Sequence, residues 1–118
     1  MYTIQFTDEG LRDVRGLAKY VRNSLKREMA EKVSRDPVGC AEPLQGILNG
    51  WYGFHYLEYR VIYKVYEDLS AVGVVAVGRH DPDVAADIYR RLEAAVHTGK
   101  LAESVLVTLR GFGETRGG

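Results

Sequence analysis

Two apolar runs in the middle of the chain, residues 60–66 and 72–78, constrain the fold more than any other part of the sequence. Only a short connection, residues 67–71, separates them, and a third run of the same kind occupies residues 51–57. Strands that follow one another after such short connections pair side by side and antiparallel. We therefore predict a three-stranded antiparallel meander at the centre of the protein.

The middle strand of this meander has two different faces. One face is apolar and is typical of a core, with Val61, Tyr63 and Val65. The alternate positions mix apolar and cationic side chains and are Arg60, Ile62, Lys64 and Tyr66. We expect this second face to form the floor of a polar cleft.

A strand and then helical segments precede the meander. Residues 2–7 alternate apolar and polar side chains, as a half-buried strand does, and Thr7 then suits the N-cap of a helix. Apolar residues recur every three or four positions from Leu11 to Val33, which indicates one continuous helical stripe. Such a helix is long for a chain of 118 residues, so we predict a helical hairpin with a break near residues 20–24.

The end of the chain divides into a helix and an extension. Asp81 and Pro82 are typical of an N-cap followed by the first helical residue, and the apolar pattern continues to His97. We therefore predict a single domain over residues 1–97. We expect residues 98–118 to form a C-terminal extension. It holds an apolar segment whose pattern does not decide between helix and strand, and it ends in a partly disordered tail.

Composition narrows the range of functions. Formal charges that sum to zero argue against broad, non-specific binding of nucleic acids. Residues 12–35 nevertheless carry an excess of Lys and Arg, which fits a binding stripe and a solvated helix face equally well.

The single cysteine, Cys40, cannot form an internal disulfide. No membrane span or secretory signal is visible, so we expect a cytoplasmic protein that does not contact membranes.

Side chains suited to phosphodiester chemistry lie at the ends of the predicted elements. RNA can be cut without a metal ion if a base takes the 2′-hydroxyl proton, a cation stabilises the phosphorane and an acid protonates the departing 5′-oxygen. Histidine suits both proton transfers, and the planar arginine fork can bind two phosphate oxygens. The candidates for catalysis are Arg60, His80, Tyr89 and His55, and the candidates for substrate binding are Arg79 and Lys64.

Each catalytic candidate also has a structural interpretation. His55 fits an exposed strand residue, and His80 fits a residue that stabilises a loop. Arg60 fits an ion-pair partner of Glu58, and Tyr89 fits a core residue. No pattern of metal ligands or of a nucleotide-binding loop occurs, so we expect neither a metal ion nor a cofactor.

Six motifs spread over most of residues 2–97 form a set: IQFT, KVSRDP, PLQG, EYRVIYKV, VVAVGRH and DIYRRL. Together they resemble the RelE/ParE superfamily of toxins from type II toxin–antitoxin systems. The resemblance implies an α+β fold in which an N-terminal strand and a helical hairpin pack on a twisted antiparallel sheet of about four strands, followed by a C-terminal helix. It also implies that a cognate antitoxin neutralises the protein.

The resemblance further implies roles for individual residues. Arg60 matches the strand arginine that contacts the scissile phosphate, and Tyr89 matches a tyrosine of the last helix. His80 stands where RelE has a second catalytic arginine, and Arg79 falls on the preceding basic position.

The chain departs from RelE in three respects. Gly53 and His55 stand at two strand positions where RelE has lysines. The formal charge is neutral, whereas ribosome-dependent toxins are strongly basic, and the chain continues after Gly99, beyond the usual end of RelE-type chains.

Three functions therefore stay open. The first is a metal-independent endoribonuclease that cleaves mRNA at the ribosome. In it Arg60 and Arg79 would hold the phosphate, while His80 and His55 would exchange protons and Tyr89 would position the substrate. The second is a ParE-like inhibitor of DNA gyrase, and the third is a non-catalytic member that binds a partner. The expected partners are a cognate antitoxin together with mRNA and the ribosome, or with gyrase, in a homo-oligomer or a toxin–antitoxin hetero-oligomer.

Overall fold

The computed structural model describes residues 1–81, 87–97 and 99, so the predicted extension lies outside the described residues except for Gly99. The strands are β1 Thr3–Phe6, β2 Glu42–Pro43, β3 Tyr52–Tyr56, β4 Tyr59–Tyr66 and β5 Ala71–Arg79. The helices are α1 Asp8–Arg15, α2 Lys19–Glu28 and α3 Ile88–His97, with short helical turns at Met29–Val33, Gly46–Leu48 and Glu67–Leu69. Among the described residues, no helix is long and apolar enough to cross a membrane.

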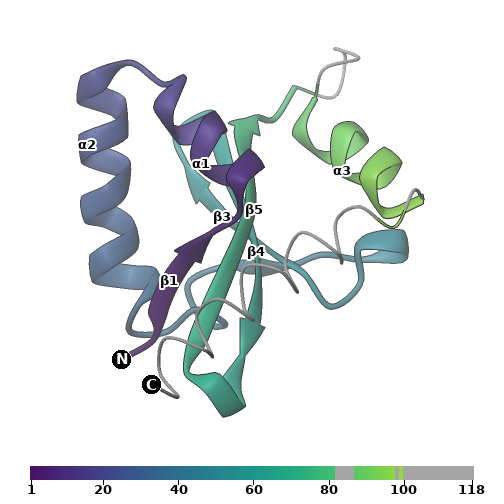
Figure 1. The fold of residues 1–118 in the computed structure, drawn as a ribbon, viewed down its shortest axis with the longest axis horizontal. Helices are drawn as coiled ribbons and strands as arrows, with labels where there is room; N and C mark the ends of the chain where they lie inside the picture. Colours follow the sequence, from purple (N-terminus) through teal and green to yellow (C-terminus); the bar gives the residue numbers. More distant parts are fainter. Residues whose placement is uncertain (82–86, 98, 100–118) are drawn as a thin grey trace.

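The strands form one sheet in the order β1-β5-β4-β3-β2, with α1 and α2 on one face and α3 on the other (Figure 1). The predicted meander is present, because β3, β4 and β5 pair antiparallel in sequence order. The predicted α+β fold is confirmed, while the sheet is mixed and has five strands, since β1 pairs with β5 in parallel and β2 extends the other edge. The parallel pair is possible because the helices carry the chain across one face before the meander begins.

The helical hairpin is present, but its break lies at residues 16–18 and not near residues 20–24. The N–H of Gly16 donates to the last carbonyls of α1, and Ala18 has an extended backbone (ψ 144°) before α2 begins. The apolar stripe continues through the break because both helices bury it against the same face of the sheet. Apolar spacing therefore concealed the break, and Gly16, a poor helix former, was its signal.

A hydrophobic core lies on each face of the sheet. Val61 and Tyr63 are buried against α1 and α2, and Ile62 packs with Leu92 on the α3 face. The second face of β4 is therefore not polar along its length, as its alternation suggested. Because α3 covers Ile62, the polar cleft is found at the Arg60 end of this face.

The described part of α3 begins at Ile88, and Asp87 caps it. Oδ2 of Asp87 accepts the backbone N–H of Tyr89 at 3.0 Å, as an N-cap side chain does. The helix start predicted at Asp81 and Pro82 leads into residues 82–86, which lie outside the described residues.

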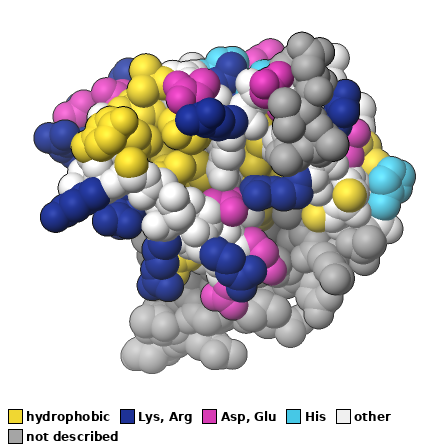
Figure 2. Space-filling view, turned by 90° about the horizontal axis from the view of Figure 1, so that it is seen from above, with side chains coloured by type: hydrophobic (Ala, Val, Ile, Leu, Met, Phe, Trp, Pro, Cys, Tyr) yellow, Lys and Arg dark blue, Asp and Glu magenta, His cyan; other side chains and the backbone are white. Residues whose placement is uncertain are grey.

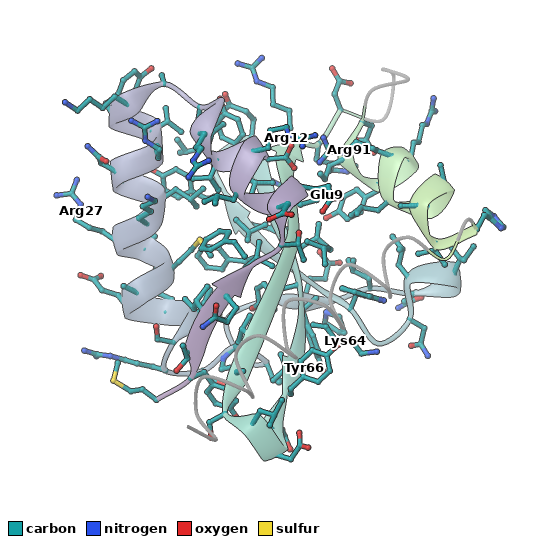
Figure 3. The ribbon with its side chains drawn as sticks, in the orientation of Figure 1. Glu9, Arg12, Arg27, Lys64, Tyr66 and Arg91 are labelled. Carbon is teal, nitrogen blue, oxygen red and sulfur yellow. The ribbon has the colours of Figure 1, made fainter. Side chains whose placement is uncertain are left out.

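Asp13, on α1, contacts both β5 and α3. The contacts lie at the C-terminal end of β5, which extends past its pairing with β1. Pairing of β1 with β5 ends at Val74, and Oδ2 of Asp13 accepts the N–H of Val77 at 3.0 Å beyond that point. The same oxygen accepts Nη2 of Arg91 at 2.6 Å, and Figure 3 shows Arg91 lying between α3 and α1 at this end of β5. Asp13 therefore ties α3, the helix that carries Tyr89, to α1 and β5.

We predict that Asp13→Ala lowers the free energy of unfolding by about 1–3 kcal/mol, because it leaves the partly buried N–H of Val77 without an acceptor. Arg91→Ala is the matched control: it removes a half-exposed cation and should cost less than about 1 kcal/mol. Urea unfolding followed by circular dichroism measures both losses. Equal losses in the two variants would contradict the larger share given to the Val77 hydrogen bond.

Candidate functional site

A pocket of about 430 Å³ opens on the α3 face of the sheet. Four residues predicted to act in catalysis line it, namely His55, Arg60, His80 and Tyr89. The rest of the lining comes from the segment around β2 and consists of Glu42, Pro43, Leu44 and Gln45. The structure thus brings the four catalytic candidates to one place.

Strand register places the cation between the two imidazoles. β4 is the middle strand of the meander, and Arg60 lies opposite His55 on β3 and opposite Gly78 on β5. His80 follows Gly78 by two positions, which returns the chain to the same face of the sheet. The N–H of His80 also donates to the carbonyl of Glu58 in the β3–β4 turn, which holds His80 beside the start of β4.

The guanidinium of Arg60 is held by its own hairpin. Nη1 donates to the carbonyls of Leu57 at 3.1 Å and Tyr59 at 2.8 Å. Leu57 has a left-handed backbone (φ 53°), which leucine seldom adopts, so this turn has a specific shape. Nε of Arg60 is buried and has no hydrogen-bond partner among the described residues. Arg60 also lines the pocket, where the positive charge of its guanidinium suits an anion.

His80 is paired with a carboxylate that the sequence did not single out. Its Nδ1 lies 2.8 Å from Oδ1 of Asp87, whose side chain is 3% exposed. Burial, the largest influence, raises the pKa of Asp87, but hydrogen bonds from His80 and from the N–H groups of Asp81 and Tyr89 outweigh it. The pKa therefore lies below its usual value, and Asp87 is ionised. Asp87 was missed because its position, directly before the described helix, becomes significant only once that helix start is known.

Tyr89 closes the pocket beside His80. The two rings meet edge to face, with centroids 4.6 Å apart and planes at 83°. Burial raises the pKa of the Tyr89 phenol, although the nearby Arg60 guanidinium acts to lower it. The phenol therefore stays protonated at neutral pH and can donate a hydrogen bond.

His55 is also paired with a carboxylate. Its Nε2 lies 3.0 Å from Oε2 of Glu42, and both side chains are substantially exposed. Glu42 reaches this position because β2 pairs it with Gly53 on β3. Glu42 fell in a segment predicted as loop, so nothing in the sequence pointed to the contact. Both imidazoles that line the pocket are thus paired with a carboxylate, and only the carboxylate of Asp87 is buried.

Two candidates for substrate binding lie outside the pocket lining. Arg79 lies opposite Tyr59, a position that faces the other side of the sheet from Arg60, and its guanidinium lies 5.7 Å from the Tyr59 ring. Nζ of Lys64 lies 5.5 Å from the Trp51 ring and 5.9 Å from the ring of Tyr66. Figure 3 shows Lys64 and Tyr66 side by side on β4. Their role in substrate binding stays a prediction.

The basic residues of the hairpin do not line the pocket either. Figure 2 shows Lys and Arg side chains along the edge where α2 lies and also across the middle of this face, interspersed with Asp and Glu. Within the described residues, no group of three or more His, Cys, Asp and Glu side chains is placed to hold a metal ion.

Residues 4–84 match the sequence model of a family described as the ParE toxin of the type II toxin–antitoxin system parDE. The chain belongs to this toxin family, within the RelE/ParE superfamily. It is 29% identical to toxin RelG of Mycobacterium tuberculosis over 90 residues, which cover 76% of this chain and 98% of that relative.

Solved structures agree with this membership. The toxin resembles a chain of the intact E. coli RelBE toxin–antitoxin complex, with a TM-score of 0.59, 27% identity, and coverage of 69% of this chain and 99% of that one. It shares its fold with a chain of the RelBE2 complex from M. tuberculosis, with a TM-score of 0.64, 24% identity, and coverage of 67% and 91%.

The structure shows what a side chain at position 53 would meet. A Cβ at Gly53 would lie 3.1 Å from the hydroxyl oxygen of Tyr89, a tighter approach than a Cβ ordinarily makes. The phenol of Tyr89 therefore occupies the space above this position in the toxin. Any side chain at position 53 must compete with Tyr89 for that space.

We predict that Gly53→Val displaces the Tyr89 phenol and lowers the pKa of Tyr89 toward the ordinary tyrosine value, because it removes the burial that raises this pKa. Carbon-13 NMR of labelled tyrosine, assigned with Tyr89→Phe, measures the titration. Gly16→Ala is the control, since a Cβ there would make ordinary contacts of 3.5 Å or more. An unchanged Tyr89 titration in Gly53→Val would contradict the competition.

Proposed function

We propose that this toxin is a metal-independent endoribonuclease that cleaves mRNA at the ribosome. The observation that carries the proposal is the position of Arg60 between His55 and His80, in a pocket that Tyr89 also lines. The guanidinium there supplies a fixed positive charge that suits a phosphate. The two imidazoles beside it can move the two protons that RNA cleavage requires.

Cleavage would proceed by attack of the 2′-oxygen on the adjacent phosphorus and departure of the 5′-oxygen. One imidazole accepts the 2′-hydroxyl proton, and the other supplies a proton to the 5′-oxygen. The products are a 2′,3′-cyclic phosphate and a 5′-hydroxyl. Arg60 stabilises the phosphorane, and the protonated phenol of Tyr89 donates a hydrogen bond to it. The protein supplies every group that these steps use.

A cognate antitoxin is the proposed protein partner. Membership of a type II toxin–antitoxin family supports it, as does similarity to a chain of the E. coli RelBE toxin–antitoxin complex. The proposed place of action is the cytoplasm, where ribosomes and mRNA meet.

Arg79 and Lys64 remain proposed contacts for RNA outside the pocket lining.

We predict that the purified toxin cleaves ribosome-bound mRNA in the presence of EDTA. Arg60→Ala should lower the cleavage rate by about 10²–10³-fold through loss of charge stabilisation. His80→Ala should lower it by about 10²–10⁴-fold through loss of a proton carrier. Arg27→Ala is the matched control, because Arg27 is an exposed cation on α2, away from the pocket (Figure 3). Primer extension on the mRNA gives the cleavage sites and rates.

Naked RNA in the same assay separates free from ribosome-dependent cleavage. Equal loss of activity in Arg27→Ala and Arg60→Ala would indicate general electrostatic binding, and cleavage that EDTA abolishes would rule out the metal-independent mechanism.

A second candidate function is inhibition of DNA gyrase. It is favoured by the match to the ParE family over residues 4–84 and by the neutral formal charge. A supercoiling assay with purified gyrase tests it. Intact mRNA together with accumulated gyrase–DNA cleavage complexes would support this function over the endoribonuclease. Inactivity in both assays, with antitoxin binding retained, would indicate a non-catalytic member.

A further inference from the structure

We propose that Asp87 is a positioning residue that holds His80 in one tautomer and so makes His80 the base that accepts the 2′-hydroxyl proton. The proposal rests on the endoribonuclease function proposed above and names the proton acceptor within it. It adds Asp87, which lies outside the set of residues that the resemblance to RelE suggested.

The carboxylate of Asp87 is fixed by more than its histidine. Oδ1 accepts the N–H of Asp81 at 2.7 Å and lies 2.8 Å from Nδ1 of His80, while Oδ2 accepts the N–H of Tyr89 at 3.0 Å. Two backbone donors therefore prevent the carboxylate from turning. Because the side chain is 3% exposed, water does not compete readily for these contacts. A fixed acceptor fixes the imidazole that binds to it.

This geometry decides which nitrogen of the neutral imidazole carries the proton. An ionised carboxylate can only accept hydrogen bonds, so Nδ1 of His80 must be the donor in the pair with Asp87. Nε2 then keeps its lone pair and is free to accept a proton. The edge-to-face contact with Tyr89 limits rotation of the ring, so the lone pair keeps its direction.

His55 is held differently. Its Nε2 pairs with Glu42, and the two side chains are 49% and 64% exposed, so this contact is open to solvent. His80, whose partner carboxylate is buried and fixed, therefore suits the base, and His55 is left to supply a proton. In the reaction, the 2′-oxygen–phosphorus bond forms as the proton moves to Nε2 of His80. The bond between phosphorus and the 5′-oxygen breaks as that oxygen takes a proton from the imidazolium form of His55, which becomes neutral.

The first test is the tautomer of His80, read by nitrogen-15 NMR of the imidazole at a pH where the ring is neutral. The wild-type toxin should show the Nδ1–H form. Asp87→Asn should shift His80 toward the Nε2–H form, because the amide NH₂ can donate to Nδ1. Glu42→Gln is the matched control and should leave the tautomer of His80 unchanged, since Glu42 pairs with the other histidine.

The second test is kinetic. Asp87→Asn should lower kcat for RNA cleavage by about 10²-fold or more, with little change in KM, because substrate binding does not require the tautomer. Asp87→Ser serves if the asparagine variant does not fold, since serine is a good N-cap for α3 but offers His80 no carboxylate. The serine variant should show a mixture of tautomers.

The outcomes separate the two proposals. An Nδ1–H tautomer that persists in both Asp87 variants would overturn the role of Asp87, and so would wild-type kcat in either variant. A wild-type toxin that cuts no RNA would overturn the endoribonuclease function, and the tautomer measurement then decides the positioning role alone.

Discussion

The register of β4 between β3 and β5 is the constraint on which the site depends. Backbone hydrogen bonds on both sides of β4 keep Arg60 opposite His55 and opposite Gly78. A slip of one residue in this register would turn Arg60 to the face covered by α1 and α2, because successive side chains point to opposite faces. The irregularity between Ile62 and Tyr63 lies farther along β4, so it leaves the Arg60 end in register.

Helix α3 completes the site because the sheet provides room for it. A Cβ at Gly78 would lie 3.1 Å from Cδ1 of Ile88, so glycine there lets the start of α3 approach β5. Gly53 provides similar room for the phenol of Tyr89 on β3. The contact between Arg91 and Asp13 then holds the helix from outside the pocket. The two glycines of the sheet and the contact between Arg91 and Asp13 together determine the position of the Tyr89 phenol in the pocket.

The two histidines that line the pocket are paired, whereas its arginine is not fully hydrogen-bonded. His80 and His55 each have a carboxylate partner, Asp87 and Glu42, whereas Arg60 keeps a buried Nε without a partner among the described residues. Such a site depends on one cation and on oriented proton carriers. This arrangement fits a chain whose formal charges sum to zero.

Most elements of the fold could be predicted because they have local signals, whereas the short strand β2 fell in a segment predicted as loop. Short connections between apolar runs gave the meander, and the alternation of residues 2–7 gave the first strand. The break in the hairpin was misplaced because the buried stripe continues across Gly16. The polar cleft was predicted too long because a strand pattern does not show which helix will cover Ile62.

The sequence by itself determined the α+β fold and the residue types at the ends of its strands and last helix, because periodicity and chemical identity are local properties of the chain. Arg60, His55, His80 and Tyr89 could be named on that basis. Only the tertiary structure decided that they share a pocket and which carboxylate each histidine meets. Those contacts depend on strand register, on the pairing of β2 with β3 and on the residue that caps α3. Each of these is set by packing between segments distant in sequence, so no local pattern encodes it.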